Sequence, residues 1–132
     1  MRYVIDASVA AEYLLRTSLG LRISELIDGA SLLAPELLDV EVFSVIRRAV
    51  ISKKLDEHRA TMALEDLADW EIDRISHRAL IREAWRFRQN VSAYDAFYVS
   101  AAKIYDVPLL TADGPLSRAP KTGIVIQNIR IA

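Results

Sequence analysis

The chain has 132 residues and a net charge of −1, and its residues are 52% hydrophobic and 27% charged. The length predicts one folded domain spanning residues 1–132, and the hydrophobic content excludes a disordered protein. The net charge differs from the strongly positive charge of a dedicated nucleic-acid binder. The chain contains no cysteine, which excludes disulfides, thiolate metal sites and a cysteine nucleophile.

The first half of the chain alternates short apolar runs with helical patterns. In chain order we predict a strand over 3–6, helices over 9–17 and 21–28, a strand over 31–34, and helices over 36–53 and 57–70. Ser8 is the expected N-cap of the first helix, Gly29 ends the second, Pro35 opens the third and Asp56 caps the fourth.

The second half continues this alternation. In chain order we predict a strand over 72–75, helices over 77–89 and 93–106, a strand over 108–111, a turn at 114–115 and a last strand over 124–129. Strands separated by helices pair in parallel, with helices on both faces of the sheet. We therefore predict an α/β fold, a three-layer α/β/α sandwich with a five-stranded parallel sheet.

The N-terminal segment does not have the pattern of a secretion signal. Asp6 and Glu12 interrupt its apolar part. No apolar run approaches the roughly 20 residues needed to cross a bilayer. We expect a soluble, cytoplasmic protein without a membrane partner.

Several acidic residues fall where a parallel sheet would bring them together. Asp6 ends the first strand, and Asp113 lies two residues after the fourth. Ligands of open parallel sheets bind beyond the carboxyl ends of the strands, so adjacent strands would bring these two carboxylates together. Asp95 lies in the first turn of a helix that is apolar on nearly every side, and Glu41 lies among apolar residues near the start of another helix.

Carboxylates gathered in this way would repel each other and raise one another's pKa values. The sequence places no Lys or Arg beside any of the four. A divalent cation such as Mg²⁺ or Mn²⁺, which prefers carboxylate oxygens and water, would compensate their charge. The pattern therefore predicts metal-assisted hydrolysis of a phosphodiester bond.

Each acid also has an ordinary structural alternative. Asp6 could cap the helix that follows it, and Asp95 could form a capping box with Ser92. Glu41 could be solvated, and Asp113 could be a turn residue. The joint placement of the four favours the metal site.

Four segments resemble those of a known family: VIDASV at 4–9, APELLDVEV at 34–42, VSAYDAFYVSAA at 91–102 and LLTAD at 109–113. In their order and spacing, the chain resembles the PIN-domain nucleases along nearly its whole length. The resemblance implies a sheet ordered 3-2-1-4-5. As a compact chain, it is similar to the VapC toxins of toxin–antitoxin pairs.

The resemblance also implies roles for individual residues. The acidic tetrad of the family falls on Asp6, Glu41, Asp95 and Asp113, its accessory hydroxyl on Thr111, and its small polar helpers on Ser8 and Ser92. It implies an endoribonuclease that uses Mg²⁺ or Mn²⁺, acts on RNA, is neutralised by a VapB-like antitoxin and forms a homodimer. The chain departs from the family at Ser44, where Asn is common, although a serine can still form a hydrogen bond there.

Other function classes fit the sequence less well. A receiver domain needs an acceptor Asp ending the third strand and a Lys near the fifth, but residues 74–76 are Arg-Ile-Ser and no Lys ends the strand predicted over 124–129. A haloacid-dehalogenase phosphatase needs Asp-x-Asp where this chain has Asp6-Ala7-Ser8. His58 and His77 could be the acid and base of a metal-free ribonuclease, but they fall on separate elements. A catalytically silent PIN scaffold, and a PIN nuclease of RNA processing outside a toxin pair, remain as alternatives.

Further residues have two interpretations each. Either of two basic groups could bind RNA phosphates or be solvated: Arg78, Arg82 and Arg86, or Arg47, Arg48, Lys53 and Lys54. The large aromatic residues Tyr13, Phe43, Trp70 and Trp85 are interpreted as core or interface residues rather than base-stacking platforms. The first-helix residues Ala10, Ala11, Tyr13, Leu14 and Leu15 are either plain core or part of an apolar groove for an antitoxin.

Overall fold

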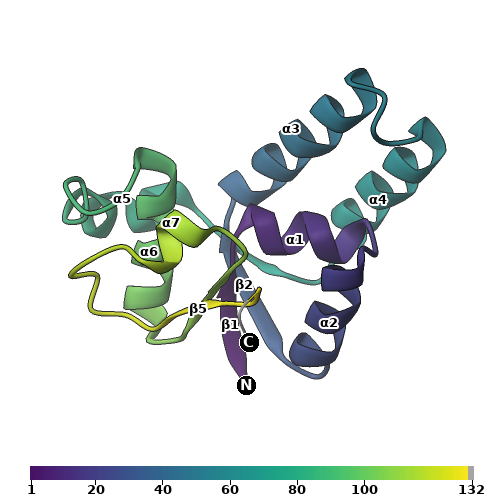
Figure 1. Ribbon diagram of the computed structural model, residues 1–132. Helices are drawn as coiled ribbons and strands as arrows, with labels where there is room; N and C mark the ends of the chain where they lie inside the picture. Colours follow the sequence, from purple (N-terminus) through teal and green to yellow (C-terminus); the bar gives the residue numbers. More distant parts are fainter. Residues whose placement is uncertain (131–132) are drawn as a thin grey trace.

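Five parallel strands form the centre of the molecule, in the order β3-β2-β1-β4-β5 (Figure 1). The structure, a computed structural model, describes residues 1–130. The strands are β1 (Arg2–Ile5), β2 (Ser31–Pro35), β3 (Asp73–Ile75), β4 (Leu109–Thr111) and β5 (Ile126–Asn128). All of their pairings are parallel, which confirms the predicted fold class and strand order.

Helices lie on both sides of this sheet, as predicted (Figure 1). One side carries α1 (Ala7–Leu14), α2 (Ser18–Ile27), α3 (Leu37–Ile51) and α4 (Glu57–Asp69). The other side carries α5 (His77–Trp85), α6 (Ala93–Tyr105) and the short α7 (Gly114–Ser117), where only a turn was predicted. Among the described residues, no helix is both long and apolar enough to cross a membrane.

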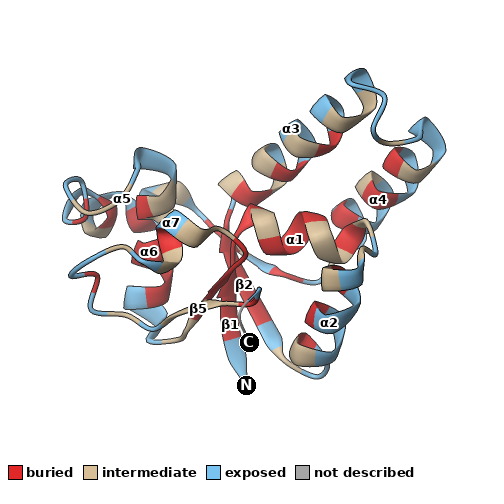
Figure 2. Cartoon of the chain, in the orientation of Figure 1, coloured by how far each residue is buried: buried red, intermediate tan, exposed pale blue. Residues whose placement is uncertain are grey.

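The central strands carry the most deeply buried part of the core (Figure 2). In β1 and β4, the side chains of Tyr3, Val4, Ile5, Leu109 and Leu110 are at most 5% exposed. Ile5 is in register with Leu110 on the neighbouring strand. The next residues along the two strands, Asp6 and Thr111, therefore reach the same edge of the sheet.

Two helices begin earlier than predicted because other residues cap them. Asp6, and not Ser8, is the N-cap of α1, since its carboxylate accepts a hydrogen bond from the Val9 amide. Thr17 caps α2 by accepting a hydrogen bond from the Gly20 amide. A Cβ atom on Gly20 would lie 1.9 Å from the Glu12 carbonyl oxygen, so this glycine permits the close approach of α1 and α2.

The prediction for α5 was too long. The helix ends at Trp85, and residues 86–90 continue as turns whose amides donate to carbonyls mostly three residues earlier. The Trp85 and Phe43 side chains are 67% and 53% exposed, so of the two roles predicted for them, core or interface, these residues do not take the core role. Tyr13 and Trp70 are partly buried and stack on each other, with ring centroids 4.7 Å apart.

Candidate active site

Asp6 is the buried centre of a hydrogen-bond network where β1 and β4 end. Its side chain is 5% exposed. Oδ1 accepts hydrogen bonds from the Ser8 hydroxyl at 2.6 Å and the Val9 amide at 3.1 Å, and Oδ2 accepts one from the Thr111 hydroxyl at 2.5 Å. Both carboxylate oxygens are therefore held in place by the protein, so Asp6 is a helix cap and a member of this network at once.

The two hydroxyl groups extend this network to the loop that carries Asp113. The Asp113 amide donates to Thr111 Oγ1 at 2.9 Å, and the Ala112 amide donates to Ser8 Oγ at 2.9 Å. Each hydroxyl gives its single proton to Asp6 and accepts a backbone hydrogen bond from the loop. The position of Asp113 is thus tied to that of Asp6.

Glu41 is held from a different direction, by a residue that the sequence analysis missed. Tyr98 on α6 is 1% exposed, and its hydroxyl donates to Glu41 Oε1 at 2.6 Å. Tyr98 lies one helical turn after Asp95, so the two share a face of α6. A buried tyrosine needs a partner for its hydroxyl, and that need was the only signal in the sequence for this residue.

The predicted tetrad comes together around Asp95. The charge of Asp95 interacts with those of Asp6, Glu41 and Asp113. Ser92 is the N-cap of α6 and accepts a hydrogen bond from the Asp95 amide at 3.2 Å, which is the first half of the capping box considered above. The four acids therefore lie close enough together for their charges to interact.

Burial makes ionisation of Asp6, Glu41 and Asp95 unfavourable. Burial raises the pKa of Asp6 to about 6, with a smaller contribution from the charge of Asp95, while hydrogen bonds from Ser8, Thr111 and Val9 act in the opposite direction. Burial also raises the pKa values of Glu41 and Asp95, and carboxylate repulsion adds to both shifts. Burial and the Glu41 carboxylate raise the pKa of Tyr98 far above its ordinary range, so its hydroxyl remains a donor.

No cationic side chain neutralises the tetrad within residues 1–130. The ion pairs found there are Arg74–Asp39, Arg86–Glu83 and Arg130–Glu12. Arg130 also reaches the loop after β4, but its Nε donates to the Ala112 carbonyl at 2.9 Å.

The donor chemistry of the tetrad fits a divalent cation, although the side chains do not form a closed cage. Across the described part of the chain, no three acidic or histidine side chains are arranged so that they could hold one ion together. Mg²⁺ usually keeps several waters and binds proteins through one or two carboxylates. Clustered carboxylate oxygens without an ion-pair partner meet that requirement.

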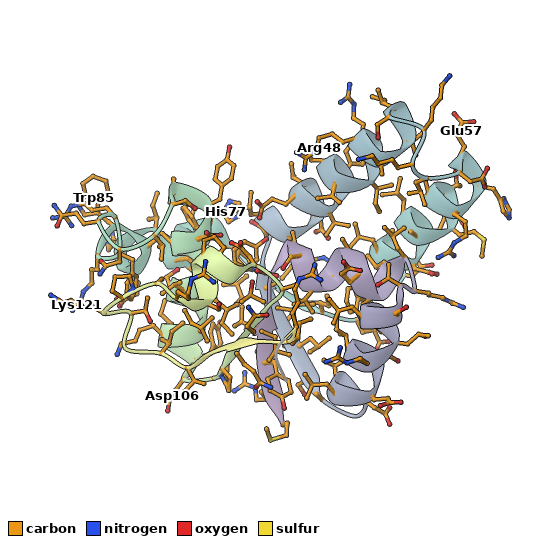
Figure 3. All side chains as sticks on the ribbon, in the orientation of Figure 1. Arg48, Glu57, His77, Trp85, Asp106 and Lys121 are labelled. Atoms are coloured by element: carbon orange, nitrogen blue, oxygen red, sulfur yellow. The ribbon has the colours of Figure 1, made fainter. Side chains whose placement is uncertain are left out.

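The histidines do not form an acid–base pair at this site. His77 Nε2 accepts a hydrogen bond from the Leu37 amide at 2.8 Å, and its ring lies 5.2 Å from that of Phe97. His58 is exposed on α4, beside Glu57, which Figure 3 places far from His77. Ser44, the departure from the family pattern, is exposed on α3.

The apolar residues of the first helix divide between core and groove. Ala10, Ala11 and Leu14 are buried core residues. Tyr13 and Leu14 also line a groove between α1, α2 and α4, together with Arg16, Gly20, Leu21, Ser24, Asp66, Asp69 and Trp70. This groove does not include any member of the tetrad.

Comparisons with known proteins identify the family of the chain. A family model described as the PIN domain matches residues 3–122. The chain is 44% identical to Ribonuclease VapC1 of Mycobacterium tuberculosis over 98 residues, which cover 74% of each protein. It is 30% identical to Ribonuclease VapC12 of the same organism over 116 residues, which cover 88% of this chain and 90% of the relative.

Two solved structures share the fold. VapBC2 from Rickettsia felis, bound to a DNA fragment from its promoter, is similar with a TM-score of 0.62 and 14% identity, covering 96% of this chain and 98% of that one. FitAcB from Neisseria gonorrhoeae is similar with a TM-score of 0.60 and 13% identity, covering 98% and 99%. At these identities the likeness concerns the fold alone.

Proposed function

The chain belongs to the PIN-domain family, and from this premise we propose that it is a metal-dependent endoribonuclease, the VapC-type toxin of a toxin–antitoxin pair. The observation that carries the proposal is the meeting of Asp6, Glu41, Asp95 and Asp113 at the carboxyl edge of the sheet without an ion-pair partner. The VapC ribonucleases among its relatives support RNA as the substrate.

Asp6, Asp95 and Asp113 would hold one or two Mg²⁺ or Mn²⁺ ions, in part through bound water molecules, with Glu41 completing the set of ligands. The ion would supply a water that is deprotonated at neutral pH and would neutralise charge on the scissile phosphate. Thr111 and Ser8 keep the Asp6 carboxylate in one orientation. Tyr98 does the same for Glu41, and Ser92 starts the helix that presents Asp95.

The proposal extends to the setting in which the enzyme acts. We expect a single domain that forms a homodimer in the cytoplasm and is neutralised by a VapB-like antitoxin. Membership of the family and the similarity to VapC ribonucleases support the antitoxin. The alternative, a catalytically silent scaffold, would need the four acids to have only structural roles.

A cleavage assay with matched variants tests this proposal. The purified protein should cut single-stranded RNA with Mg²⁺ or Mn²⁺, stop when EDTA is added, and leave a 5′-phosphate. Asp95→Asn should abolish cleavage, while Asp66→Asn, which changes an exposed acid on α4, should cut like the wild type. Cleavage that persists in EDTA, or in a folded Asp95→Asn protein, would overturn the mechanism, and no cleavage at all would favour the silent scaffold.

A further inference from the structure

The charges of the chain are divided unequally between two parts of the fold. Residues 1–75 contain nine Lys and Arg against fourteen Asp and Glu, whereas residues 76–132 contain eight against four. The first part includes α1 to α4, and the second includes α5, α6 and α7, which lie on the opposite side of the sheet in Figure 1. A near-neutral chain therefore has one acidic side and one basic side.

On the basic side, α5 and its C-cap residue, Arg86, carry a row of arginines. Arg78, Arg82 and Arg86 recur every four residues, so they share one face, and all three are exposed. Successive members are separated by about 6 Å along the helix axis. Glu83 is the only acid in residues 76–90, and it pairs with Arg86 at 3.6 Å. Most of the positive charge of this row is available to a ligand.

The row begins beside the acidic site. His77, the first residue of α5, accepts a hydrogen bond from Leu37, the first residue of the helix that carries Glu41. The His77 ring also contacts Phe97, two residues after Asp95. Figure 3 shows His77 near the centre of the molecule and Trp85, at the other end of α5, at its outer margin.

Trp85 adds an aromatic surface to the outer end of this row. Its side chain is 67% exposed. The Arg88 guanidinium lies 4.9 Å from the ring centroid and donates to the Trp85 carbonyl at 3.0 Å, which holds this cation against the indole. An exposed indole beside arginines is suited to stacking on an unpaired base and binding its phosphates.

We propose that Arg78, Arg82, Trp85, Arg86 and Arg88, here called the α5 face, bind the single-stranded RNA that enters the acidic site. The proposal rests on the ribonuclease function above and names the surface that holds its substrate. The arginines contact successive phosphates, and Trp85 stacks on a base. Single-stranded RNA is the ligand because only unstacked bases offer a free face to the indole.

A second copy of the chain fits this surface less well. Ile81 is 57% exposed beside Trp85, so the α5 face has an apolar part that another protein could cover. In a two-fold symmetric contact, however, the same surface meets itself. The four arginines and the single acid of one copy would then face the same residues of the other copy, and contacts between like charges are unfavourable.

RNA binding can be measured apart from cleavage. In the Asp95→Asn background with EDTA, the affinity for a fluorescent single-stranded RNA of mixed sequence is determined by anisotropy at several salt concentrations. Combining Arg78→Gln, Arg82→Gln and Arg86→Gln should weaken binding about tenfold and reduce the slope of log K against log salt by about 2. The matched control combines Arg47→Gln, Arg48→Gln and Lys54→Gln on exposed positions in and just after α3, removes the same charge, and should retain the parent affinity.

The aromatic contribution has its own matched pair. Trp85→Ala should weaken RNA binding about fivefold or more, since base stacking is worth about 1–3 kcal/mol. Tyr105→Ala, which removes an exposed ring that also has an arginine over it, should have no effect. With Asp95 intact, the triple arginine variant should raise KM and leave kcat nearly unchanged.

The outcomes separate this proposal from the ribonuclease function. Equal RNA affinity of the two triple variants would contradict RNA binding by the α5 face, whereas cleavage by the wild type would still support the ribonuclease function. RNA binding through the α5 face without cleavage supports the face and contradicts the ribonuclease. If Trp85→Ala keeps full RNA affinity and instead converts a dimer to a monomer in size-exclusion chromatography, the face is an interface between copies and the proposal is wrong.

Discussion

Tyr98 and Glu41 lie 57 residues apart in the chain, and the hydroxyl of the first donates a 2.6 Å hydrogen bond to the carboxylate of the second. This contact joins α6 to α3. Because Asp95 lies one turn before Tyr98, α6 presents one acid of the tetrad and also positions another. The tetrad therefore depends on how two helices pack, as well as on the edge of the sheet.

Tyr98→Phe should reduce both stability and cleavage. The substitution removes one buried hydroxyl and keeps the ring, so we expect a loss of about 1 kcal/mol in the free energy of unfolding, measured with urea. The pKa of Glu41 should rise further, because the hydrogen bond from Tyr98 lowers it. Tyr105→Phe, at an exposed position, is the control. Full cleavage by Tyr98→Phe would show that the hydroxyl does not position Glu41.

Asp6 should make the metal-free protein less stable as the pH rises. Its pKa is about 6 in the folded protein and its ordinary value is 3.8, so between these values the folded state binds more protons than the unfolded state. The free energy of unfolding should therefore fall by about 2–3 kcal/mol as the pH rises from about 4 through about 6.

Asp6→Asn tests this assignment in EDTA by urea unfolding at a series of pH values. The variant should lose most of this decline and be more stable than the wild type at neutral pH by about 2 kcal/mol. Asp66→Asn, an exposed acid, should keep the wild-type pH dependence. An unchanged pH dependence in Asp6→Asn would mean that another group causes the decline.

Divalent cations should stabilise the folded protein. An ion that binds only the native state adds about 2.7 kcal/mol at a concentration one hundred times its Kd, which calorimetry detects as a higher Tm. Asp95→Asn should lose most of this gain, because Asp95 is the acid whose charge interacts with the other three. An equal rise of Tm in wild type and Asp95→Asn would place the ion elsewhere.

His77→Leu should weaken the start of α3. The substitution removes the acceptor for the Leu37 amide, so we expect a loss of about 1 kcal/mol in the free energy of unfolding. Cleavage should also fall, since α3 carries Glu41. Glu36→Ala at the same helix end is the control, because the Glu36 side chain makes no capping hydrogen bond. Equal stability of the two variants would contradict the role of His77.

The sequence by itself determined the alternation of strands and helices and the local position of each acid. Apolar runs such as Val4–Ile5 and Leu109–Leu110 specify strands through short-range patterns, and the family resemblance supplied their order in the sheet. Asp6 and Asp113 could therefore be placed at the carboxyl edge before any coordinates were known.

Only the tertiary structure decided which side chains hold those acids and which surfaces remain exposed. Local sequence does not indicate the hydrogen bond between Tyr98 and Glu41, the hydrogen bond that His77 accepts at the start of α3, or the exposure of Trp85. Each depends on the packing of elements distant in the chain. The residues adjacent in the sequence largely determine the secondary structure of a residue, but the tertiary fold determines which other side chain it contacts.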